Sequence, residues 1–265
     1  MKYLFEHWEA VTKEIKDKVI FLFLDYDGTL APIAEAPDKA KISKGTKELL
    51  SQLSKNLRFK LAIISGRSLT DIKNSIGLKD IIYAGNHGLE IEGPDIKFTS
   101  QISPRLKSII RVINDDLLAK LSGIKGAYIE DKGLTISVHY RLVSNGDLPL
   151  LQSIFTEITK PFIVRGKIKI SSGKKVYEIK PPFQWDKGEV VLWLLARQQF
   201  LRGESTILPV YIGDDVTDED AFKVLKNKGL TVFAGESSGS EAAYYLKNTE
   251  EVAEFLKRIL GLNKE

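Results

Sequence analysis

The sequence contains no cysteine, one methionine and three histidines in 265 residues. Without cysteine the chain has no disulfide, no thiolate ligand for zinc and no thiol nucleophile. A bound metal therefore has to be held by oxygen atoms or by histidine. Nine prolines and 20 glycines are too few for a collagen-like or low-complexity chain. Because 43% of the residues are hydrophobic and 28% are charged, we expect a globular protein.

Long hydrophobic runs are also missing. The longest wholly apolar segments, Val190–Ala196 and Val19–Leu24, have seven and six residues, whereas a membrane-spanning helix needs about 20. Acidic and basic residues are interleaved in the first 18 residues, which predicts an amphipathic helix rather than a signal peptide. The net charge of +4 is spread along the chain and does not indicate nucleic-acid binding. We therefore expect a cytoplasmic protein with no membrane and no nucleic-acid partner.

Short apolar segments alternate with helical patterns along most of the chain. The predicted strands are Val19–Leu24, Leu61–Ile64, Ile81–Ala84, Val210–Ile212 and Leu230–Phe233. The predicted helices are Lys44–Lys55, Ser68–Ile76, Asp186–Arg202, Thr217–Lys228 and Thr249–Leu260. This alternation predicts an α/β fold with a Rossmann-like, doubly wound parallel sheet. Acidic residues and glycines follow the strands directly, and the ligand crevice of such a sheet lies beyond the carboxyl ends of its strands.

A segment of about 80 residues in the middle of the chain breaks this rhythm, a length near the lower end for a domain. Its predicted helices are Pro104–Leu121 and Leu148–Lys160, and its predicted strands are Tyr128–Glu130, Leu134–Tyr140, Phe162–Val164, Lys167–Ile170 and Lys175–Ile179. Short connections that contain glycine predict antiparallel pairing of these strands. Gly93-Pro94 and Pro181-Pro182 are plausible hinges. We therefore predict a core of residues 1–93 and 182–265 with a small α/β domain of residues 94–181 inserted.

The pentapeptide Asp25-Tyr26-Asp27-Gly28-Thr29 directly follows the first predicted strand. Two carboxylates two residues apart at a strand end can take different roles. One can attack a substrate or bind a metal, while the other gives and takes a proton. A simple turn is the alternative for this segment, since Asp and Gly are ordinary turn residues.

Two further segments are suited to binding an anion. Ser65-Gly66-Arg67 follows a strand and offers a hydroxyl and backbone N–H groups at the start of a helix. Lys187 falls at the start of the helix Asp186–Arg202, where the helix dipole disfavours a cation unless a partner such as phosphate is present. Taken singly, Ser65 is equally well explained as an ordinary helix cap, and Lys187 as a side chain that reaches solvent.

Five acids lie between Gly213 and Asp220. A charged helix start with Thr217 as the N-cap explains Asp218 to Asp220. It does not explain the adjacent pair Asp214-Asp215, because the repulsion between these carboxylates is most easily relieved by a divalent cation.

These four segments, in this order and each at a strand end or helix start, resemble the haloacid dehalogenase superfamily of phosphotransferases. The resemblance implies that Asp25 attacks phosphorus and that Asp27 protonates the leaving oxygen and then activates water. Ser65 and Lys187 would hold the phosphoryl oxygens. Mg²⁺ would be bound between Asp25, the Asp27 carbonyl and Asp214, with Asp215 and Asp218 ordering its water molecules. Phosphoryl transfer asks mainly for positioning and charge neutralisation, which this set supplies.

The inserted domain lies where this superfamily carries its larger type of cap. Four segments look like those of trehalose-6-phosphate phosphatases: Ala84-Gly85-Asn86-His87-Gly88, Glu130-Asp131-Lys132-Gly133, Val138-His139-Tyr140-Arg141 and Glu178-Ile179-Lys180-Pro181. The resemblance covers about Phe21 to Leu260. It implies that cap residues grip the distal glucose at positions that correspond to Glu130, Lys132 and Glu178, with Arg141 and His87 close by. Thr29, Gly66, Arg67 and Lys180 complete the expected substrate-binding residues.

The resemblance predicts a Mg²⁺-dependent phosphatase that cleaves trehalose 6-phosphate, and a monomer is compatible with the sequence. Phosphatases of sucrose phosphate, of mannosyl-phosphoglycerate or of a monosaccharide phosphate are alternatives of the same class. A non-catalytic phosphosugar sensor, or a receiver-like module, is an alternative of another class. Asp27 argues against it, because a second carboxylate would hydrolyse a signalling aspartyl-phosphate. Glu130, Lys132 and Lys180 are also explained as solvent-facing strand residues, and Trp185 and Trp193 as core residues.

Overall fold

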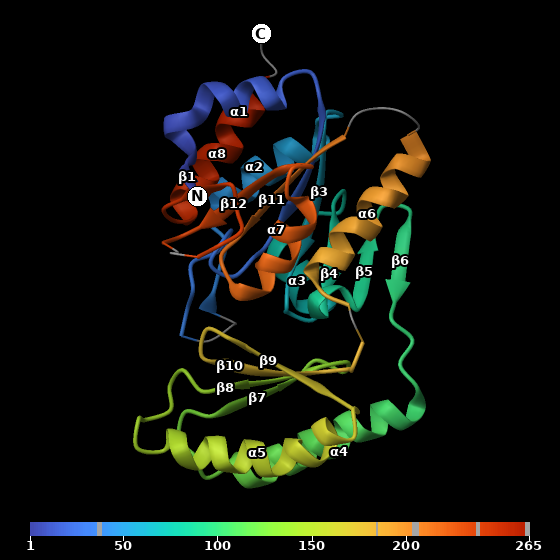
Figure 1. Ribbon diagram of the computed structural model, residues 1–265, viewed down its shortest axis with the longest axis vertical. Coiled ribbons are helices and arrows are strands. Elements are labelled where there is room, and N and C mark those ends of the chain that lie inside the picture. The colour runs from blue at the N-terminus through green and yellow to red at the C-terminus, as the bar shows by residue number, and fades with distance from the viewer. Residues whose placement is uncertain (36–38, 184, 203–206, 237–238, 263–265) are drawn as a thin grey trace. The chain divides into compact units, whose positions relative to one another are not determined.

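The computed structural model describes residues 1–35, 39–183, 185–202, 207–236 and 239–262, and it divides into two compact units (Figure 1). The first unit, the core, comprises Met1–Thr99 and Trp185–Glu265. The second unit, the cap, comprises Ser100–Gln184. The second unit overlaps the predicted insertion, and its bounds differ from the predicted residues 94 and 181. No helix in the described ranges has both the length and the apolar character to cross a bilayer.

The core contains a sheet that has nine strands among the described residues, in the order β1-β13-β12-β11-β2-β3-β4-β5-β6. The strands from β1 to β4 in this order pair in parallel, and β5 and β6 join antiparallel at one edge. The bounds are β1 Lys2–Tyr3, β2 Val19–Leu24, β3 Phe59–Ile64, β4 Ile82–Gly85, β5 Glu90–Gly93, β6 Ile96–Thr99, β11 Ile207–Gly213, β12 Leu230–Ala234 and β13 Tyr244–Leu246.

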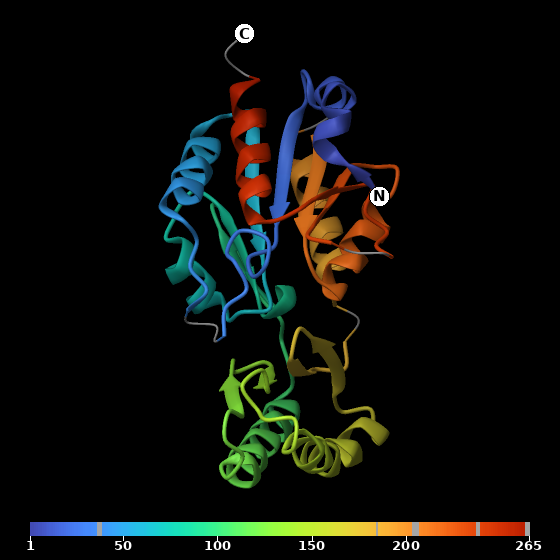
Figure 2. The same cartoon turned by 90° about the vertical axis from the view of Figure 1, so that its left-hand side faces the viewer.

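Helices cover both faces of this sheet (Figure 2). They are α1 Trp8–Ile15, α2 Lys44–Lys55, α3 Leu69–Ile76, α6 Lys187–Arg202, α7 Glu219–Leu225 and α8 Thr249–Gly261. Strand β2 has an unbroken apolar sequence because its side chains are buried on both faces of the sheet. Ile20, Leu22 and Leu24 belong to one hydrophobic cluster with α2, α3 and α8, whereas Phe21 and Phe23 belong to a second cluster with α6 and α7. The predicted doubly wound α/β fold is confirmed.

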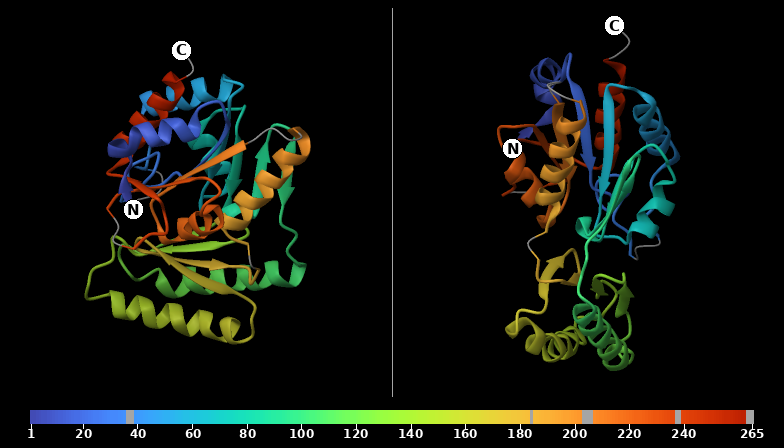
Figure 3. Two further views of the ribbon diagram at one scale, coloured as in Figure 1. Left: turned by 45° about the horizontal axis from the view of Figure 1, so that its top comes forward. Right: turned by 90° about the vertical axis from the view of Figure 1, so that its right-hand side faces the viewer.

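The cap is a four-stranded antiparallel sheet with two helices. The sheet order is β7-β8-β10-β9, with β7 Tyr128–Asp131, β8 Ile136–His139, β9 Lys169–Gly173 and β10 Val176–Lys180. The helices α4 Pro104–Leu121 and α5 Leu148–Val164 lie on the same face of this sheet (Figures 1 and 3). Phe155 of α5 stacks on Tyr177 of β10, with ring centroids 4.7 Å apart. Strand alternation therefore turns the neighbouring residue, Glu178, to the opposite face.

Two predictions about the elements are wrong. Phe162–Val164, predicted as a strand, is the last turn of α5. The half-buried Phe162 follows the buried residues Leu151, Phe155 and Ile158 at helical spacing, and this apolar stripe outweighs the β propensity of the segment. Helix α5 continues through Pro161, although proline removes one helical hydrogen bond.

The first predicted hinge, Gly93-Pro94, is a hairpin turn instead. Pro94 and Asp95 connect β5 to β6, and Asp95 takes the left-handed conformation with φ of 58°. Both strands of this hairpin belong to the core sheet, so residues 94–99 are part of the core rather than of the cap. At the second boundary, Trp185 belongs to the core because its indole N–H donates to the Gly88 carbonyl at 2.8 Å.

Candidate active site

The loop after β2 packs against the segment after β11. The Asp25 N–H donates to the Ile212 carbonyl at 2.9 Å, and the Gly28 N–H donates to the Ala31 carbonyl at 2.7 Å. Gly28 has φ of +92°, and a Cβ atom there would lie 2.0 Å from Asp214 Oδ2. Only glycine satisfies both the backbone angle and this approach. The loop is therefore hydrogen-bonded to β11 and lies in close approach to the carboxylate of Asp214.

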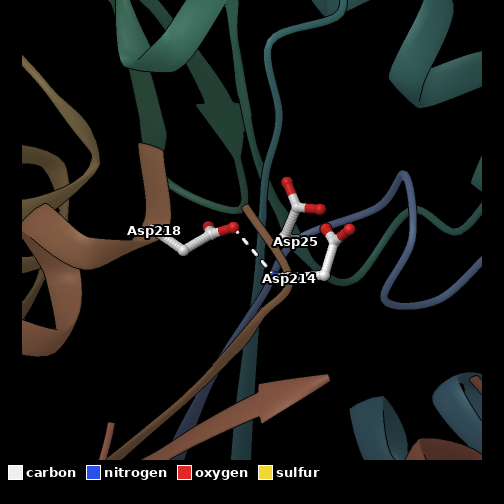
Figure 4. Close-up of side chains that lie close together, drawn as sticks. All are labelled: Asp25, Asp214 and Asp218. Atoms are coloured by element: carbon white, nitrogen blue, oxygen red, sulfur yellow. Dashed lines mark hydrogen bonds between the residues drawn. The ribbon is translucent and has the colours of Figure 1, made fainter. Parts of the chain in front are cut away.

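Lys187 lies between two carboxylates in the interior of the core. Its Nζ donates to Asp25 Oδ1 at 2.7 Å and to Asp218 Oδ1 at 2.6 Å, and the lysine side chain is only 3% exposed. One ligand oxygen from each of Asp25, Asp214 and Asp218 lies within 4.8 Å of the others. Figure 4 shows the side chains of Asp25 and Asp214 next to each other. With all three carboxylates ionised, three carboxylates around one ammonium carry an excess of two negative charges.

The electrostatics follow from burial and from this charge excess. Burial raises the pKa of Asp25 well above its usual value against the opposing effect of Lys187, and Asp218 and Asp214 raise it further. Burial acts to lower the pKa of Lys187, but Asp218 and Asp25 outweigh it and raise that pKa well above its usual value. Lys187 is therefore an ammonium ion at neutral pH.

Asp218 fixes the segment after β11 by accepting hydrogen bonds from its backbone. Its Oδ2 accepts hydrogen bonds from the backbone N–H groups of Asp214 and Asp215, both at 3.0 Å (Figure 4 draws the first). Its Oδ1 accepts from Lys187 and, at 2.6 Å, from the hydroxyl of Tyr211. A carboxylate has about four acceptor positions, so these donors fill Asp218. Asp25 and Asp214 are the other two members of the acidic cluster.

The alternative explanation with Thr217 as the N-cap is wrong, because Asp215 takes this position. The Asp215 carboxylate accepts from the Val216 N–H at 2.6 Å, and Asp215 and Asp218 form a reciprocal capping box around the short 3₁₀ helix Val216–Asp218. The spacing of three residues that defines such a box starts two residues earlier than expected.

Arg67 holds Asp27. Its Nε and Nη2 donate to the two carboxylate oxygens of Asp27, both at 2.7 Å, and its Nη1 donates to Asp71 at 2.8 Å. The guanidinium also lies over the ring of Tyr26, 4.8 Å from the centroid. The Arg67 side chain is 5% exposed, whereas that of Asp27 is 41% exposed. Arg67 therefore orients Asp27 through a bidentate contact. The sequence predicts Arg67 only as part of an anion-binding segment and does not predict this contact.

Ser65 follows β3 and is joined to the loop after β4. Its hydroxyl accepts from the Arg67 N–H at 3.2 Å, and its carbonyl accepts from the His87 N–H at 2.9 Å. Asn86, His87 and Gly88 are buried and have φ of 50°, 55° and 91° in succession. Such conformations are rare for residues other than glycine and are found at functional sites. Gly88 accepts from Trp185, two residues before Lys187, so this loop connects the Ser65 segment to the start of α6.

Thr29 is the remaining predicted residue of the core. It is fully buried, and its Oγ1 has no hydrogen-bond partner among the described residues. A buried hydroxyl without a partner is costly, so this oxygen can still accept or donate a hydrogen bond. The acidic cluster consists of oxygen donors, which suits a hard divalent cation such as Mg²⁺.

In the cap, the predicted sugar-binding residues gather on the face of the sheet opposite Tyr177. Glu130, Ser137, Glu178 and Ser171 form one row across the four strands. Glu178 pairs with Lys132 at 3.3 Å and with Lys180 at 3.1 Å. Glu130 contacts His139 at 2.9 Å. These side chains are 5–23% exposed, so the fully solvent-facing alternative does not hold for them.

Arg141 stands apart from this row: its guanidinium donates to the Lys174 carbonyl at 2.7 Å on an exposed turn. The structure thus brings together the core residues in one group and the cap residues in another. Sequence reasoning missed Ser137, Trp185 as a hydrogen-bond donor and Tyr211. A signal existed for Tyr211: it is the one polar side chain in Val210–Ile212, and a buried phenol requires a partner. Burial keeps its pKa well above the usual value, reinforced by Asp218, so it remains a donor.

Comparisons of the sequence with protein families and with individual proteins agree with one another. The sequence matches the family described as trehalose-phosphatase over residues 23–250. It is 36% identical over 265 residues to "Probable trehalose-phosphate phosphatase D" of Arabidopsis thaliana, which covers 96% of this chain and 70% of that protein. It is 34% identical over 272 residues to "Trehalose 6-phosphate phosphatase RA3" of Zea mays, covering 95% and 73%.

Solved structures extend the comparison to the fold. A crystal structure described as a trehalose-6-phosphate phosphatase related protein superposes with a TM-score of 0.76 at 29% identity, covering 92% of this chain and 100% of that one. The C-terminal domain of a C. albicans trehalose-6-phosphate phosphatase gives a TM-score of 0.82 over 96% of each chain at 22% identity. At this lower identity the likeness shows a shared fold.

Proposed function

Because this chain belongs to the trehalose-phosphatase family, we propose that it hydrolyses trehalose 6-phosphate to trehalose and phosphate through an aspartyl-phosphate on Asp25. The single observation that carries the chemistry is the position of Asp25. It is a buried carboxylate in contact with the ammonium of Lys187 and beside Asp214, and Asp27 follows two residues later. This arrangement offers a nucleophile, a cation for the phosphoryl oxygens and a second carboxylate for proton transfer.

In the first step a carboxylate oxygen of Asp25 attacks phosphorus, and the bond from phosphorus to the sugar oxygen breaks. Asp27 donates a proton to that leaving oxygen. In the second step Asp27 takes a proton from water, the water oxygen attacks the aspartyl-phosphate, and phosphate is released with Asp25 restored. Lys187 and the hydroxyl of Ser65 bind the equatorial phosphoryl oxygens, where charge is spread in the transition state. Arg67 holds both oxygens of Asp27 in its carboxylate form, which is the form that takes the proton from water in the second step.

We propose that Mg²⁺ is held by Asp25, Asp214 and the backbone carbonyl of Asp27, with Asp215 and Asp218 supporting this site. When bound it neutralises charge on the phosphoryl group. Asp218 supports the site by fixing the backbone of Asp214 and the ammonium of Lys187, because its oxygens already accept hydrogen bonds from four donors. Thr29 Oγ1 is a further oxygen available to the bound ligands.

The cap supplies recognition of the disaccharide in this proposal. Sugar hydroxyls donate and accept at once, and the carboxylates of Glu130 and Glu178 form ion pairs with the ammonium groups of Lys132 and Lys180. His87 and Arg141 are proposed to assist at this end of the substrate. Binding the distal glucose away from the phosphate lets recognition contribute to turnover.

The proposal is tested with the Asp25→Asn variant, which is nearly isosteric and removes the nucleophile. We expect phosphate release from trehalose 6-phosphate to fall by about a thousandfold or more, with circular dichroism unchanged. Comparable activity in the variant would reject covalent catalysis through Asp25. Binding of trehalose 6-phosphate without any phosphate release by the unmodified protein would favour the sensor alternative.

A further inference from the structure

The hydroxyl of Tyr211 lies in the candidate active site, although no step of the proposed mechanism uses it. Tyr211 is on β11 and is fully buried. Its ring meets Phe222 of α7 edge to face, with centroids 5.6 Å apart. This packing requires an aromatic ring and would be met equally well by phenylalanine. The hydroxyl has a separate partner, because it donates to Asp218 Oδ1 at 2.6 Å.

Asp218 Oδ1 is shared between Tyr211 and Lys187. The ammonium of Lys187 lies 2.6 Å from this oxygen and 2.7 Å from Asp25 Oδ1, so it bridges the two carboxylates. The other oxygen of Asp218 is occupied by two backbone N–H groups. The negative charge that Asp218 presents to Lys187 therefore depends on the hydrogen bond from Tyr211. With that bond removed, Oδ1 would attract the ammonium more strongly, because one of its two donors is lost.

We propose that Tyr211 is a positioning residue that acts through Asp218 to keep Lys187 within reach of a phosphoryl group at Asp25. Tyr211 itself does not touch the substrate. The inference rests on the proposed phosphatase function, because it assumes that Lys187 binds the phosphoryl oxygens. A purely structural hydroxyl would stabilise the fold and leave phosphate binding unchanged, so the two roles are separable.

The variant Tyr211→Phe removes the hydroxyl and keeps the ring. Tyr83→Phe is the matched control, because Tyr83 is also buried in the core sheet. Among the described residues, the Tyr83 hydroxyl has hydrogen bonds only with the backbone of Leu78: it donates to the carbonyl at 2.7 Å and accepts from the N–H at 3.1 Å. Both variants lose a buried phenol, and thermal unfolding of each shows whether it is folded. The readouts are the Kd of inorganic phosphate in the presence of Mg²⁺, measured by calorimetry, and kcat and KM for an aryl phosphate.

We expect Tyr211→Phe to weaken phosphate binding by about tenfold and to lower kcat by a similar or larger factor. The loss of one hydrogen bond to a charged group has an effect of about this size on an equilibrium or rate constant. Tyr83→Phe should change neither quantity. In a Lys187→Met background, Tyr211→Phe should have no further effect on the phosphate Kd, because Tyr211 acts on phosphate binding by positioning Lys187.

An unchanged phosphate Kd in Tyr211→Phe, an equal change in Tyr83→Phe, or a full additional effect in the Lys187→Met background would overturn the proposal. If Lys187→Met does not fold, the comparison of the two tyrosine variants decides. If the unmodified protein binds phosphate but releases none from any ester, the proposed function fails, while the phosphate Kd still tests Tyr211. A protein that binds no phosphate at all would contradict both.

Discussion

At the scale of single residues, the site depends on very close approaches between charged side chains and backbone. Lys187 and the carboxylates of Asp25 and Asp218 are nearly inaccessible to solvent, so water does not screen their interactions. Removing one member of such a group leaves the others without their partner, which costs more than the pair contributes as a whole. Near-isosteric changes are therefore the informative ones here.

Gly28→Ala tests how closely the loop after β2 has to approach Asp214. The added Cβ would lie 2.0 Å from Asp214 Oδ2, so either the loop or the carboxylate has to move. We expect turnover to fall by about a hundredfold, the effect of roughly a 1 Å displacement in an active site. The measurement is kcat for an aryl phosphate at saturating Mg²⁺.

Gly166→Ala is the control for this change. Gly166 also has a positive φ, of +61°, but its Cβ would meet no heavy atom within 4 Å in the described part of the chain. It therefore carries the backbone strain without the collision, and we expect normal turnover. Equal activity of the two variants would show that the approach of Gly28 to Asp214 is not needed.

At the scale of helices and strands, the sequence predicts the long elements well. Strand β2 and helices α2 and α4 have the predicted bounds, because unbroken apolar runs and helical spacing are strong patterns. The edge strands β1 and β13 have two and three residues, too few for any periodicity. The pair Gly93-Pro94 predicts a hinge because proline interrupts both kinds of structure, whereas Pro94 begins a hairpin turn.

Contacts between elements were predictable only in part. That Asp25, Ser65 and Asp214 follow parallel strands places them at one edge of the sheet, as expected. The bidentate contact of Arg67 with Asp27 and the filled acceptor positions of Asp218 depend on side-chain directions in loops, which spacing does not specify. The positive φ of Asn86 and His87 is likewise invisible in the sequence, because neither residue requires it.

The hydroxyl of Tyr83 on β4 predicts a dependence of stability on pH. Burial raises its pKa from 10.0 to about 12, against a smaller opposing effect of the Leu78 hydrogen bond. Because the pKa is higher in the folded state, this stabilisation is complete below about pH 10 and is lost as the pH rises through about 12. Near pH 11 the loss is about 1 kcal/mol relative to Tyr83→Phe. Urea unfolding of both proteins between about pH 8 and 11 measures it, and a constant difference would contradict it.

The polar row of the cap predicts a substrate-dependent effect. Glu178→Gln keeps the shape of the side chain but removes the charge that pairs with Lys132 and Lys180. We expect kcat/KM for trehalose 6-phosphate to fall about tenfold or more, because hydrogen bonds to the sugar are lost. Turnover of an aryl phosphate should change little.

Glu157→Gln on α5 provides the matched control in the same unit. Glu157 pairs with Lys120 at 2.8 Å on an exposed surface, with 66% of its side chain accessible, so its loss should affect neither substrate. Equal losses on both substrates in Glu178→Gln would mean that the row supports the cap rather than binding sugar.

At the scale of the whole molecule, the order of the segments carries the assignment. Each of the Asp25, Ser65, Lys187 and Asp214 segments is ambiguous by itself, but all four lie at strand ends or a helix start of one core. Lys187 reaches Asp25 across 162 positions of the sequence. An insertion as large as the cap is compatible with this geometry. The chain leaves the core after Thr99 and returns to it at Trp185 without interrupting the nine-stranded sheet of the described core.

The most direct test of the account is phosphate release from trehalose 6-phosphate, sucrose 6-phosphate, glucose 6-phosphate and an aryl phosphate, with Mg²⁺ and after its removal by a chelator. We predict release that requires Mg²⁺ and a clear preference for trehalose 6-phosphate. Equal activity on glucose 6-phosphate would contradict recognition of the distal ring by the cap. Release that persists without a divalent cation would contradict the role given to Asp25 and Asp214.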